Sequence, residues 1–247
     1  MKKLKIQRKL KNFNSNVKTK INNEIKRKGK KGFIWEIIFS FLIFCASAVL
    51  IFVLYIIISA PNFEKDKLYK KEATVIYDKN GIEFARVGQE DRELIEYKDL
   101  PQVYIDALIA TEDSRFFQHN GLDIARFLKA SVGQLVSSKA GGASTITMQL
   151  VKKNYTNGAS EGIAGIVRKF TDIYMAVFKI ESSYTKEEIL EFYSNSLWYA
   201  NGRSINTTGI YGIEQASQHF FGKSVRELNL AEASLIVGMY QNPRLYN

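Results

Sequence analysis

The sequence predicts a mainly α-helical domain that carries a short N-terminal β-hairpin and is preceded by one transmembrane helix. Three patterns indicate this: an uncharged apolar run over residues 37–59, an Asn-Gly turn between two short apolar segments, and apolar residues at helical spacing after residue 99. The 247 residues suffice for one ordinary domain and an appendage, and are too few for two large catalytic domains. A single cysteine excludes a disulfide scaffold, and a hydrophobic content of 46% excludes wholesale disorder.

The positive charge of the chain is concentrated in its first 32 residues. The formal net charge is +10, and residues 1–32 hold 13 Lys and Arg against one acid, Glu24. The other 215 residues carry 22 basic and 24 acidic side chains, a net charge of −2. The basicity therefore belongs to a tail, which is typical of a topology signal with affinity for anionic lipid headgroups. Nucleic acid is not an expected partner.

The segment after this basic tail is long enough to cross a bilayer. Residues 37–59 contain no charge, and Pro61 closes the run. About 20 apolar residues span a bilayer, so a transmembrane helix is predicted within residues 33–60. The Lys and Arg on its N-terminal flank predict that residues 1–32 are cytoplasmic and that the remainder is extracytoplasmic. A cleaved signal peptide is the competing interpretation, and the length of the run argues against it.

A β-hairpin is predicted at the start of the external domain. Residues 61–72 are interpreted as a polar juxtamembrane linker, and the domain is expected over residues 73–247. The short apolar runs Thr74–Tyr77 and Ile82–Ala85 flank Asp-Lys-Asn-Gly at 78–81. Asn-Gly between two such runs is a strong hairpin signal.

The rest of the domain is expected to be helical. Asp99 and Gln102 form a variant of the capping box, with Pro101 in the first turn, and predict a helix that ends near Glu112. A helix over residues 163–177 is indicated by apolar residues spaced by three, four and seven. Further helices are expected over residues 122–138 and 144–155, and after the capping boxes Thr185 with Glu188 and Asn229 with Glu232.

The first candidates for chemistry are Glu112 and Asp113, where an apolar helix ends. The helix dipole disfavours negative charge at that end. A carboxylate held there against apolar neighbours is expected to bind its proton more tightly, which suits a general base. The alternative is that the two acids begin a solvated loop.

Two further stretches combine polar side chains with a predicted helix. A Gly pair at 141–142 precedes Ser144 and Thr145, so the next helix would offer free N–H groups and hydroxyls to an anionic or sugar ligand. Arg168 and Asp172 stand four residues apart, on the face opposite the apolar positions of the long helix. The alternatives are a simple loop with an N-cap, and a surface ion pair worth about 0.3–0.5 kcal/mol.

In this order, the stretches resemble the peptidoglycan glycosyltransferases of glycosyltransferase family 51. This family includes the transglycosylase module of class A penicillin-binding proteins and the monofunctional transglycosylases. The resemblance runs from about residue 74 to the C-terminus and implies a lysozyme-like glycosyltransferase domain. The matching positions are Glu112, Asp113, Phe116, His119 and Gly121 in the first motif, Gly142, Ser144, Thr145, Gln149 and Lys152 in the second, and Thr185 to Asn195 in the fourth.

The resemblance implies a reaction and a role for each site residue. Lipid II, the undecaprenyl-diphosphate-linked disaccharide-pentapeptide, would be polymerised into β-1,4 glycan with inversion at the donor anomeric carbon. Glu112 would take the proton from the 4-hydroxyl of the acceptor, and Asp113 and Asp172 would order the polar network. The implied substrate-binding residues are Phe116, His119, Ser144, Thr145, Gln149, Lys152, Arg168 and Lys169.

The resemblance also implies the cofactors and partners. Lys152, Arg168 and Lys169 would neutralise the departing diphosphate, with Mg²⁺ or Mn²⁺ as candidate cofactors. No nucleotide is needed, because the lipid diphosphate is itself the activated donor. The expected location is the bacterial cytoplasmic membrane, with the nascent glycan strand and proteins of cell-wall synthesis or division as partners. Moenomycin would occupy the donor site.

Two positions depart from the pattern of the family. The third motif usually reads Arg-Lys-x-x-Glu, and this chain has Asp172 at the Glu position, so the charge is kept and the reach is one methylene shorter. The segment between Ala176 and Tyr184 is one residue longer than the commonest spacing.

Two other functions compete with this prediction. A lytic transglycosylase or lysozyme shares the fold class and cuts glycan, but has no need of a cationic diphosphate site. An inactive membrane scaffold is the second alternative, since a fold does not guarantee an activity. Ser183 and Lys186 match a transpeptidase Ser-x-x-Lys by accident, and no Lys-Thr-Gly follows. The sequence is compatible with a monofunctional enzyme and with a fragment of a bifunctional one.

Overall fold

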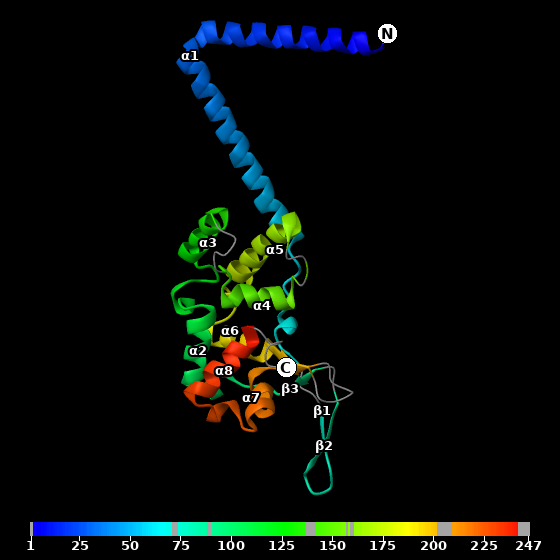
Figure 1. Cartoon of the computed structure of the whole chain (residues 1–247), viewed down its shortest axis with the longest axis vertical. Coiled ribbons are helices and arrows are strands. Elements are labelled where there is room, and N and C mark those ends of the chain that lie inside the picture. The colour runs from blue at the N-terminus through cyan, green and yellow to red at the C-terminus, as the bar shows by residue number, and fades with distance from the viewer. Residues whose placement is uncertain are drawn as a thin grey trace. The chain divides into compact units, whose positions relative to one another are not determined.

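The chain divides into two parts, residues 1–58 and residues 59–247, in the computed structural model. Helix α1 (Lys2–Ser59) makes up nearly all of the first part (Figure 1). The structure describes residues 2–70, 74–87, 90–136, 142–156, 158, 161–201 and 209–241.

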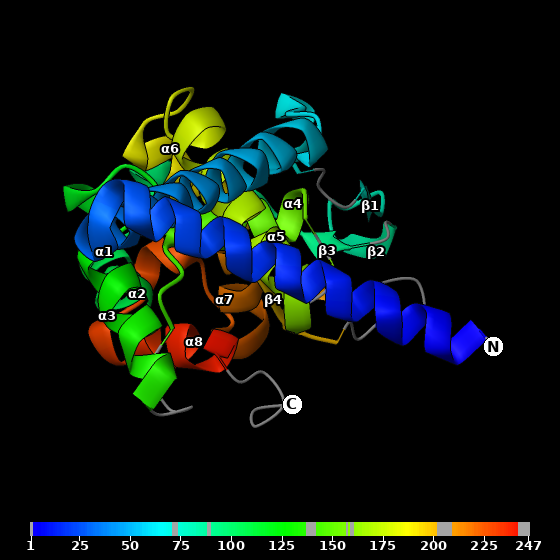
Figure 2. The ribbon, with the colours of Figure 1, turned by 90° about the horizontal axis from the view of Figure 1, so that it is seen from above.

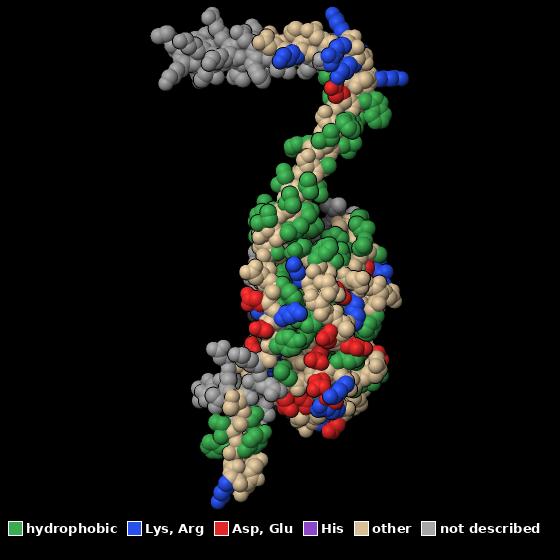
Figure 3. All heavy atoms as spheres, turned by 180° about the vertical axis from the view of Figure 1, so that it is seen from behind, with side chains coloured by type: hydrophobic (Ala, Val, Ile, Leu, Met, Phe, Trp, Pro, Cys, Tyr) green, Lys and Arg blue, Asp and Glu red, His purple; other side chains and the backbone are tan. Residues whose placement is uncertain are grey.

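Helix α1 contains the predicted transmembrane segment. The helix is interrupted at Gly29, where φ is 73° and ψ is 160°. In the part of the chain that the structure describes, Lys26–Ser59 is the one helix long and apolar enough to cross a membrane. Large apolar side chains such as Phe39 and Phe44 are well exposed along it (Figure 3). Such an all-round apolar surface is typical of a helix that lies in lipid.

Residues 59–247 form the predicted mainly helical domain. Helix α4 packs against both α5 and α6, and α2 packs against α8; α4 and α5 lie side by side in Figures 1 and 2. The helices are α2 (Gln102–Glu112), α3 (Ile124–Val136), α4 (Ile146–Asn154), α5 (Gly162–Met175), α6 (Lys186–Ser196), α7 (Ile213–Phe221) and α8 (Leu230–Gln241). Short 3-10 turns occupy Lys65–Lys67 (η1), Tyr97–Asp99 (η2), Phe116–Gln118 (η3) and Val225–Glu227 (η5).

The predicted hairpin is confirmed. Strand β1 (Thr74–Tyr77) pairs antiparallel with β2 (Glu83–Val87). The Asp78 carboxylate organises the turn, because it accepts the backbone N–H groups of Asn80 at 2.7 Å and of Ile82 at 2.9 Å. Gly81 has a φ of +79°, a conformation that glycine adopts without strain.

A second, three-stranded sheet was not predicted. Its order is β3-β5-β4, with β3 parallel and β4 antiparallel to the central strand. Strands of two or three residues are too short for an alternating pattern to be visible in a sequence. The strands are β3 (Asp91–Arg92), β4 (Trp198–Ala200) and β5 (Ile210–Tyr211).

The predicted cap at Asp99 is wrong, and the two capping boxes are confirmed. Helix α2 begins after Pro101 with no side-chain cap, which leaves Asp99 too far from its first N–H groups. The Asp99 carboxylate instead accepts a hydrogen bond from Arg226 at 2.9 Å. Both reciprocal bonds are present in the pairs Thr185 with Glu188 and Asn229 with Glu232.

The predicted juxtamembrane linker packs onto the domain over its described residues, 61–70. Leu68 is 1% exposed and belongs to the hydrophobic core. The Phe63 ring lies 5.8 Å from the ring of Tyr155, whose hydroxyl donates to the Glu64 carbonyl at 2.8 Å. The apolar residues among the charges therefore anchor this segment. Residues 71–72, Gly141 and the end of the predicted helix at 137–138 lie outside the described residues.

The extra residue between Ala176 and Tyr184 coincides with a π-helix. This segment, η4 (Ala176–Ile180), continues directly from α5, and the Glu181 N–H donates to the Ala176 carbonyl at 3.0 Å. A π-turn takes one more residue than an α-turn and so accommodates an inserted residue within a continuing helix.

Helix α5 turns its polar face toward the interior. Its apolar residues Ile163 and Ile166 are 81% and 56% exposed, and Asp172 is 3% exposed. Among the alternatives from sequence, a surface ion pair between Arg168 and Asp172 is therefore wrong. A helix with apolar residues outward and a charge inward is stable in water only with compensating partners for both faces.

Gly121 provides a test of how tightly the loop after α2 packs on the π-helix. Its φ is +81°, and a Cβ atom there would lie 3.0 Å from the backbone of Ala176 and Val177. We expect Gly121→Ala to lower the free energy of unfolding by more than the ~1–2 kcal/mol of left-handed strain alone. The matched control is Gly222→Ala, where φ is +68° and no atom lies within 4 Å. Equal losses in denaturant unfolding of the two variants would contradict this packing.

Candidate functional site

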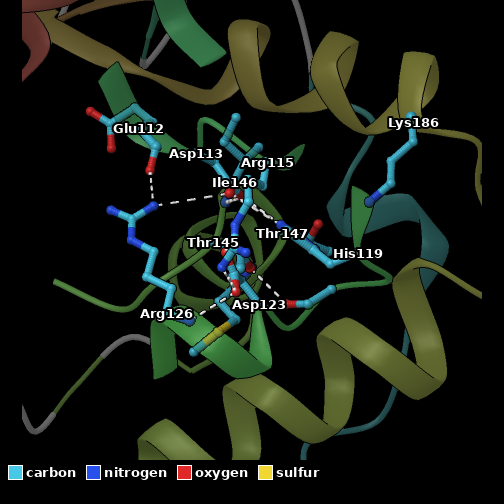
Figure 4. Close-up of polar contacts among 12 residues, drawn as sticks. Glu112, Asp113, Arg115, His119, Asp123, Arg126, Thr145, Ile146, Thr147 and Lys186 are labelled. Carbon is cyan, nitrogen blue, oxygen red and sulfur yellow. Dashed lines mark hydrogen bonds and ion pairs between the residues drawn. The ribbon is translucent and has the colours of Figure 1, made fainter. Parts of the chain in front are cut away.

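Glu112 is the last residue of α2, and its carboxylate is bound to a residue of α4. Glu112 Oε2 accepts a hydrogen bond from Gln149 Nε2 at 2.8 Å. The backbone carbonyl of Glu112 accepts one from Arg126 Nη1 at 2.9 Å (Figure 4). Glu112 and Gln149 are both half-buried, so the pair stands at the edge of the core. The structure thus brings two predicted site residues together across 37 positions of sequence.

Asp113 joins the first motif to the second. Its side chain has no exposed surface, and both carboxylate oxygens lie 3.1 Å from His119 Nε2. One of them also accepts the backbone N–H of Ile146, the first residue of α4, at 3.1 Å (Figure 4). Arg126 Nη1 is 4.0 Å away. The Asp113 carboxyl group therefore fixes the start of α4 against the loop after α2. Glu112, Asp113, His119 and Gln149 are called the acid cluster.

Phe116 and Thr145 support the site from within the core. Both side chains are fully buried, and their predicted role in substrate binding stays a prediction. Thr145 is the N-cap of α4, accepting the Met148 N–H at 3.2 Å and donating to the Gly121 carbonyl at 2.7 Å. The Lys186 ammonium lies over the Phe116 ring, 4.3 Å from the ring centroid, in a cation–π contact.

Sequence reasoning missed Arg126. This residue stands in the first turn of α3, where its backbone N–H donates to Asp123 at 2.9 Å. Its guanidinium donates to the carbonyls of Glu112 and Gly142, so it links the end of α2 to the residues just before α4. The sequence signal was slight, because an Arg in the first turn of an amphipathic helix is usually a solvated residue.

A second group of predicted residues gathers around the cations of α4 and α5. The Arg168 guanidinium donates to the buried Asp172 carboxylate at 2.6 Å, and Lys169 Nζ donates to Ser144 Oγ at 2.9 Å. Lys152 is exposed, and it makes no hydrogen bond or ion pair within the described residues. Sequence reasoning also missed Thr156, whose hydroxyl donates to Asp172. Lys152, Arg168 and Lys169, with Ser144 and Asp172, are called the cation cluster.

The charges of the cation cluster act on one another. Burial raises the pKa of Asp172, and the Thr156 hydrogen bond and the nearby cations oppose this rise. Burial also lowers the pKa of Lys169; Asp172 opposes that shift, and the charges of Arg168 and Lys152 add to it. Three cations held together with one buried anion therefore favour the binding of a further anion.

A cavity of about 790 Å³ adjoins the cation cluster. It lies between α3 and α5, and Arg168 and Lys169 contribute to its lining. The other walls are mostly apolar or small, which suits a ligand with an anionic group and an apolar body. They are formed by Phe127, Ala130, Ser131, Gly142, Ala143, Gly162, Gly165, Ile166 and Phe170.

The described residues contain no group of three or more His, Cys, Asp or Glu side chains placed to hold a metal ion. Mg²⁺ commonly takes one or two protein carboxylates and completes its shell with phosphate and water oxygens. Asp172 is the carboxylate of the cation cluster that could serve in this way.

The family of the chain follows from a match to known sequences. Residues 80–247 match the family described as Transglycosylase, and the chain belongs to this family. The resemblance seen in the sequence motifs is thereby confirmed.

The curated relatives are penicillin-binding proteins. The chain is 36% identical over 213 residues to penicillin-binding protein 1A of Neisseria meningitidis serogroup A, covering 85% of this chain and 25% of that protein. It is 33% identical over 227 residues to penicillin-binding protein 1A/1B of Bacillus subtilis, covering 90% and 24%. It is 33% identical over 193 residues to penicillin-binding protein 1A of Streptococcus pneumoniae, covering 78% of this chain and 26% of that protein. The chain spans about a quarter of the length of these relatives.

Lys153 provides a test of the electrostatics beside the acid cluster. Burial lowers the pKa of its ammonium to about 8, and the adjacent Lys152 adds to the shift. Between about pH 8 and the ordinary lysine value near 10.4, the unfolded chain holds a proton that the folded chain has lost, so stability rises with pH. We expect the parent to gain stability relative to Lys153→Met across this range in urea unfolding. Stability curves that stay parallel would contradict this environment for Lys153.

Proposed function

We propose that the chain is a membrane-anchored peptidoglycan glycosyltransferase that polymerises lipid II into β-1,4 glycan and releases undecaprenyl diphosphate. One observation carries the proposal: α4 connects a half-buried carboxylate to a group of cations. Gln149 binds Glu112, and Lys152 stands one turn further along the same helix. A proton acceptor held close to a cationic diphosphate site is what transfer from a lipid diphosphate to a sugar hydroxyl requires. Membership of the transglycosylase family supports the same reaction.

Glu112 is assigned the role of the general base that takes the proton from the acceptor hydroxyl. Its carboxylate would accept the proton of the 4-hydroxyl while that oxygen bonds to the anomeric carbon of the donor. The bond from this carbon to the diphosphate oxygen would break on the opposite face, and this in-line geometry inverts the anomeric centre. The hydrogen bond from Gln149 orients the carboxyl group for this step.

The cation cluster is assigned the role of stabilising the diphosphate leaving group. Negative charge develops on the diphosphate as its bond to the sugar breaks, and cations already held in place stabilise that charge without reorganisation. Lys152 is available because no anion pairs with it in the described part of the chain. Asp172 aligns the Arg168 guanidinium, so it serves as a positioning residue. Mg²⁺ or Mn²⁺, held by Asp172 and the diphosphate, remains a proposed cofactor that would supply further positive charge there.

The surface of α3 and α5 supports a lipid-linked substrate. On α3, Ile124, Leu128 and Val132 form an exposed apolar stripe. On α5 the exposed residues Ile163 and Ile166 do the same. These stripes flank the cavity whose lining includes Arg168 and Lys169, so a prenyl chain would meet apolar surface where its diphosphate meets cations. A substrate confined to a bilayer also accounts for an enzyme with a membrane-spanning helix.

The orientation in the membrane is testable by protease access. Basic residues flank the N-terminal side of the apolar run, so residues 1–32 are proposed to be cytoplasmic and the domain extracytoplasmic. Protease added to intact protoplasts is expected to degrade residues 61–247 and to spare the tail. Protection of the entire chain would contradict both the orientation and access to an external glycan strand.

Polymerisation of labelled lipid II tests the proposed reaction. General-base assistance is worth about 10²–10⁴-fold, so Glu112→Gln should lose at least about 10²-fold in turnover while keeping its shape. Lys152→Ala should also lower turnover sharply, because it removes a cation from the diphosphate. The matched control is Lys79→Ala, in the exposed turn of the hairpin. Moenomycin should inhibit the parent.

Three outcomes would change the assignment. Polymerisation by Glu112→Gln at the parent rate would exclude Glu112 as the base. A greater loss in Asp172→Ala than in Glu112→Gln would move the base to α5. Cleavage of purified sacculi without polymerisation of lipid II would favour a glycan-cleaving enzyme, and inactivity on both substrates would favour a scaffold.

A further inference from the structure

The amide of Gln149 is bound at both ends. Its nitrogen donates to Glu112 Oε2, as described above, and its oxygen faces two tyrosine hydroxyls. Tyr193, from α6, donates to Gln149 Oε1 at 3.0 Å, and Tyr240, from α8, donates to the same atom at 3.4 Å. An amide oxygen has two lone pairs, so these hydroxyls can satisfy it completely. Three helices therefore converge on the residue that binds the candidate base.

The two tyrosines are themselves held in place. The Tyr193 side chain is fully buried, and its ring meets the Tyr240 ring edge-on, with 6.2 Å between centroids. The Tyr240 ring also contacts Tyr199 at 6.3 Å and carries the Lys153 ammonium 5.1 Å from its centroid. Burial raises the pKa of the Tyr193 and Tyr240 hydroxyls, so both keep their protons and act as donors at neutral pH.

The orientation of the Gln149 amide determines whether its nitrogen or its oxygen faces the Glu112 carboxylate. In the observed direction an N–H group points at the carboxylate, and the ionised form gains a hydrogen bond. After a flip, the amide oxygen would face the carboxylate, and two acceptors in contact repel each other unless one carries a proton. The flip would also deprive the Tyr193 and Tyr240 hydroxyls of the acceptor they share. These hydroxyls therefore stabilise the direction that suits an ionised Glu112.

We propose that Tyr193 and Tyr240 are positioning residues for the transglycosylase reaction: through Gln149 they hold Glu112 as an oriented carboxylate. The role of this carboxylate as a general base rests on the proposed function. The effect of the two tyrosines on the titration of Glu112 can be measured without an activity assay. Other titratable or charged groups also face Glu112. They include Arg126 from α3, Lys153 from α4, Tyr104 from α2 and Tyr199 from β4.

The experiment compares the titration of the Glu112 carboxyl in the full chain in detergent micelles. The probe is ¹³C NMR of ¹³C-labelled Glu, with the Glu112 signal assigned by its loss in Glu112→Gln. We expect Tyr193→Phe to raise the titration midpoint by about 0.5–1 pH unit, because the amide loses its stronger anchor. Tyr240→Phe should raise it less, given the longer contact, and the double variant should raise it most.

Tyr104→Phe is the matched control. Its hydroxyl is also buried and faces Glu112, but it donates to Ser194 at 3.1 Å and does not contact Gln149. The control should therefore leave the Glu112 midpoint at the parent value. A midpoint unchanged in Tyr193→Phe and in the double variant would overturn the proposal, and so would an equal shift in Tyr104→Phe. Tyr240→Phe, in a half-buried position, keeps the test decisive if Tyr193→Phe is poorly folded.

Turnover separates this inference from the proposed function. If the proposed function and the positioning role both hold, the acid limb of the pH–rate profile for lipid II polymerisation shifts to higher pH in Tyr193→Phe. The size of this shift should equal the change in the Glu112 titration midpoint. If the midpoint shifts and the parent does not polymerise lipid II, the positioning role stands and the proposed function fails. If the parent polymerises lipid II and neither the midpoint nor the profile moves, the positioning role fails alone.

Discussion

The buried carboxylate of Asp113 is the interaction on which the rest of the site depends. It accepts the first N–H of α4 and a hydrogen bond from His119, and it has no contact with solvent. A buried charge is stable only when its lone pairs are filled, so this one requires the loop after α2 and the start of α4 to meet in one geometry. That geometry determines where α4 lies, and α4 carries both Gln149 and Lys152.

The two clusters make opposite electrostatic demands, and α4 keeps them apart. In the proposed reaction, the base needs a carboxylate that is oriented and not neutralised, whereas the diphosphate site needs uncompensated positive charge. Gln149 orients the Glu112 carboxylate through an amide N–H group. Because an amide is neutral, this hydrogen bond adds no positive charge beside the carboxylate. Lys152, one turn away, makes no hydrogen bond or ion pair in the described residues, although its charge acts on Asp172. Helix α4 thus contributes a neutral amide to the Glu112 carboxylate of α2 and a lysine to the cation cluster.

Helix α5 shows how the site changes the usual rules of packing. A surface helix normally buries its apolar stripe, and α5 instead buries Asp172 and exposes Ile163. The buried charge is compensated by Arg168 and Thr156, and the exposed stripe flanks the cavity beside the cations. In a soluble setting this arrangement would lower stability on both faces. In the proposed setting at a bilayer, the exposed apolar face would contact lipid instead of water.

The sequence by itself determined the elements whose signal is local. The Asn-Gly hairpin, the capping boxes at Thr185 and Asn229 and the apolar run of α1 depend on neighbours a few residues apart, and all appear as predicted. Asp99 was wrong because the start of α2 is decided by Pro101 and by a partner, Arg226, that lies far away in sequence.

Tertiary structure alone decided how the motif residues are used. The motifs indicated that Glu112, Gln149 and Lys152 belong to one site, but Phe116 and Thr145 carry the same motif signal and are buried supports. Arg126, Tyr193 and Tyr240 could not be found from spacing, because each acts through a contact between helices distant in the chain. Local patterns report helix faces and caps. Which face is buried, and which polar atom meets which, depends on the packing of α2, α4, α6 and α8 around one another.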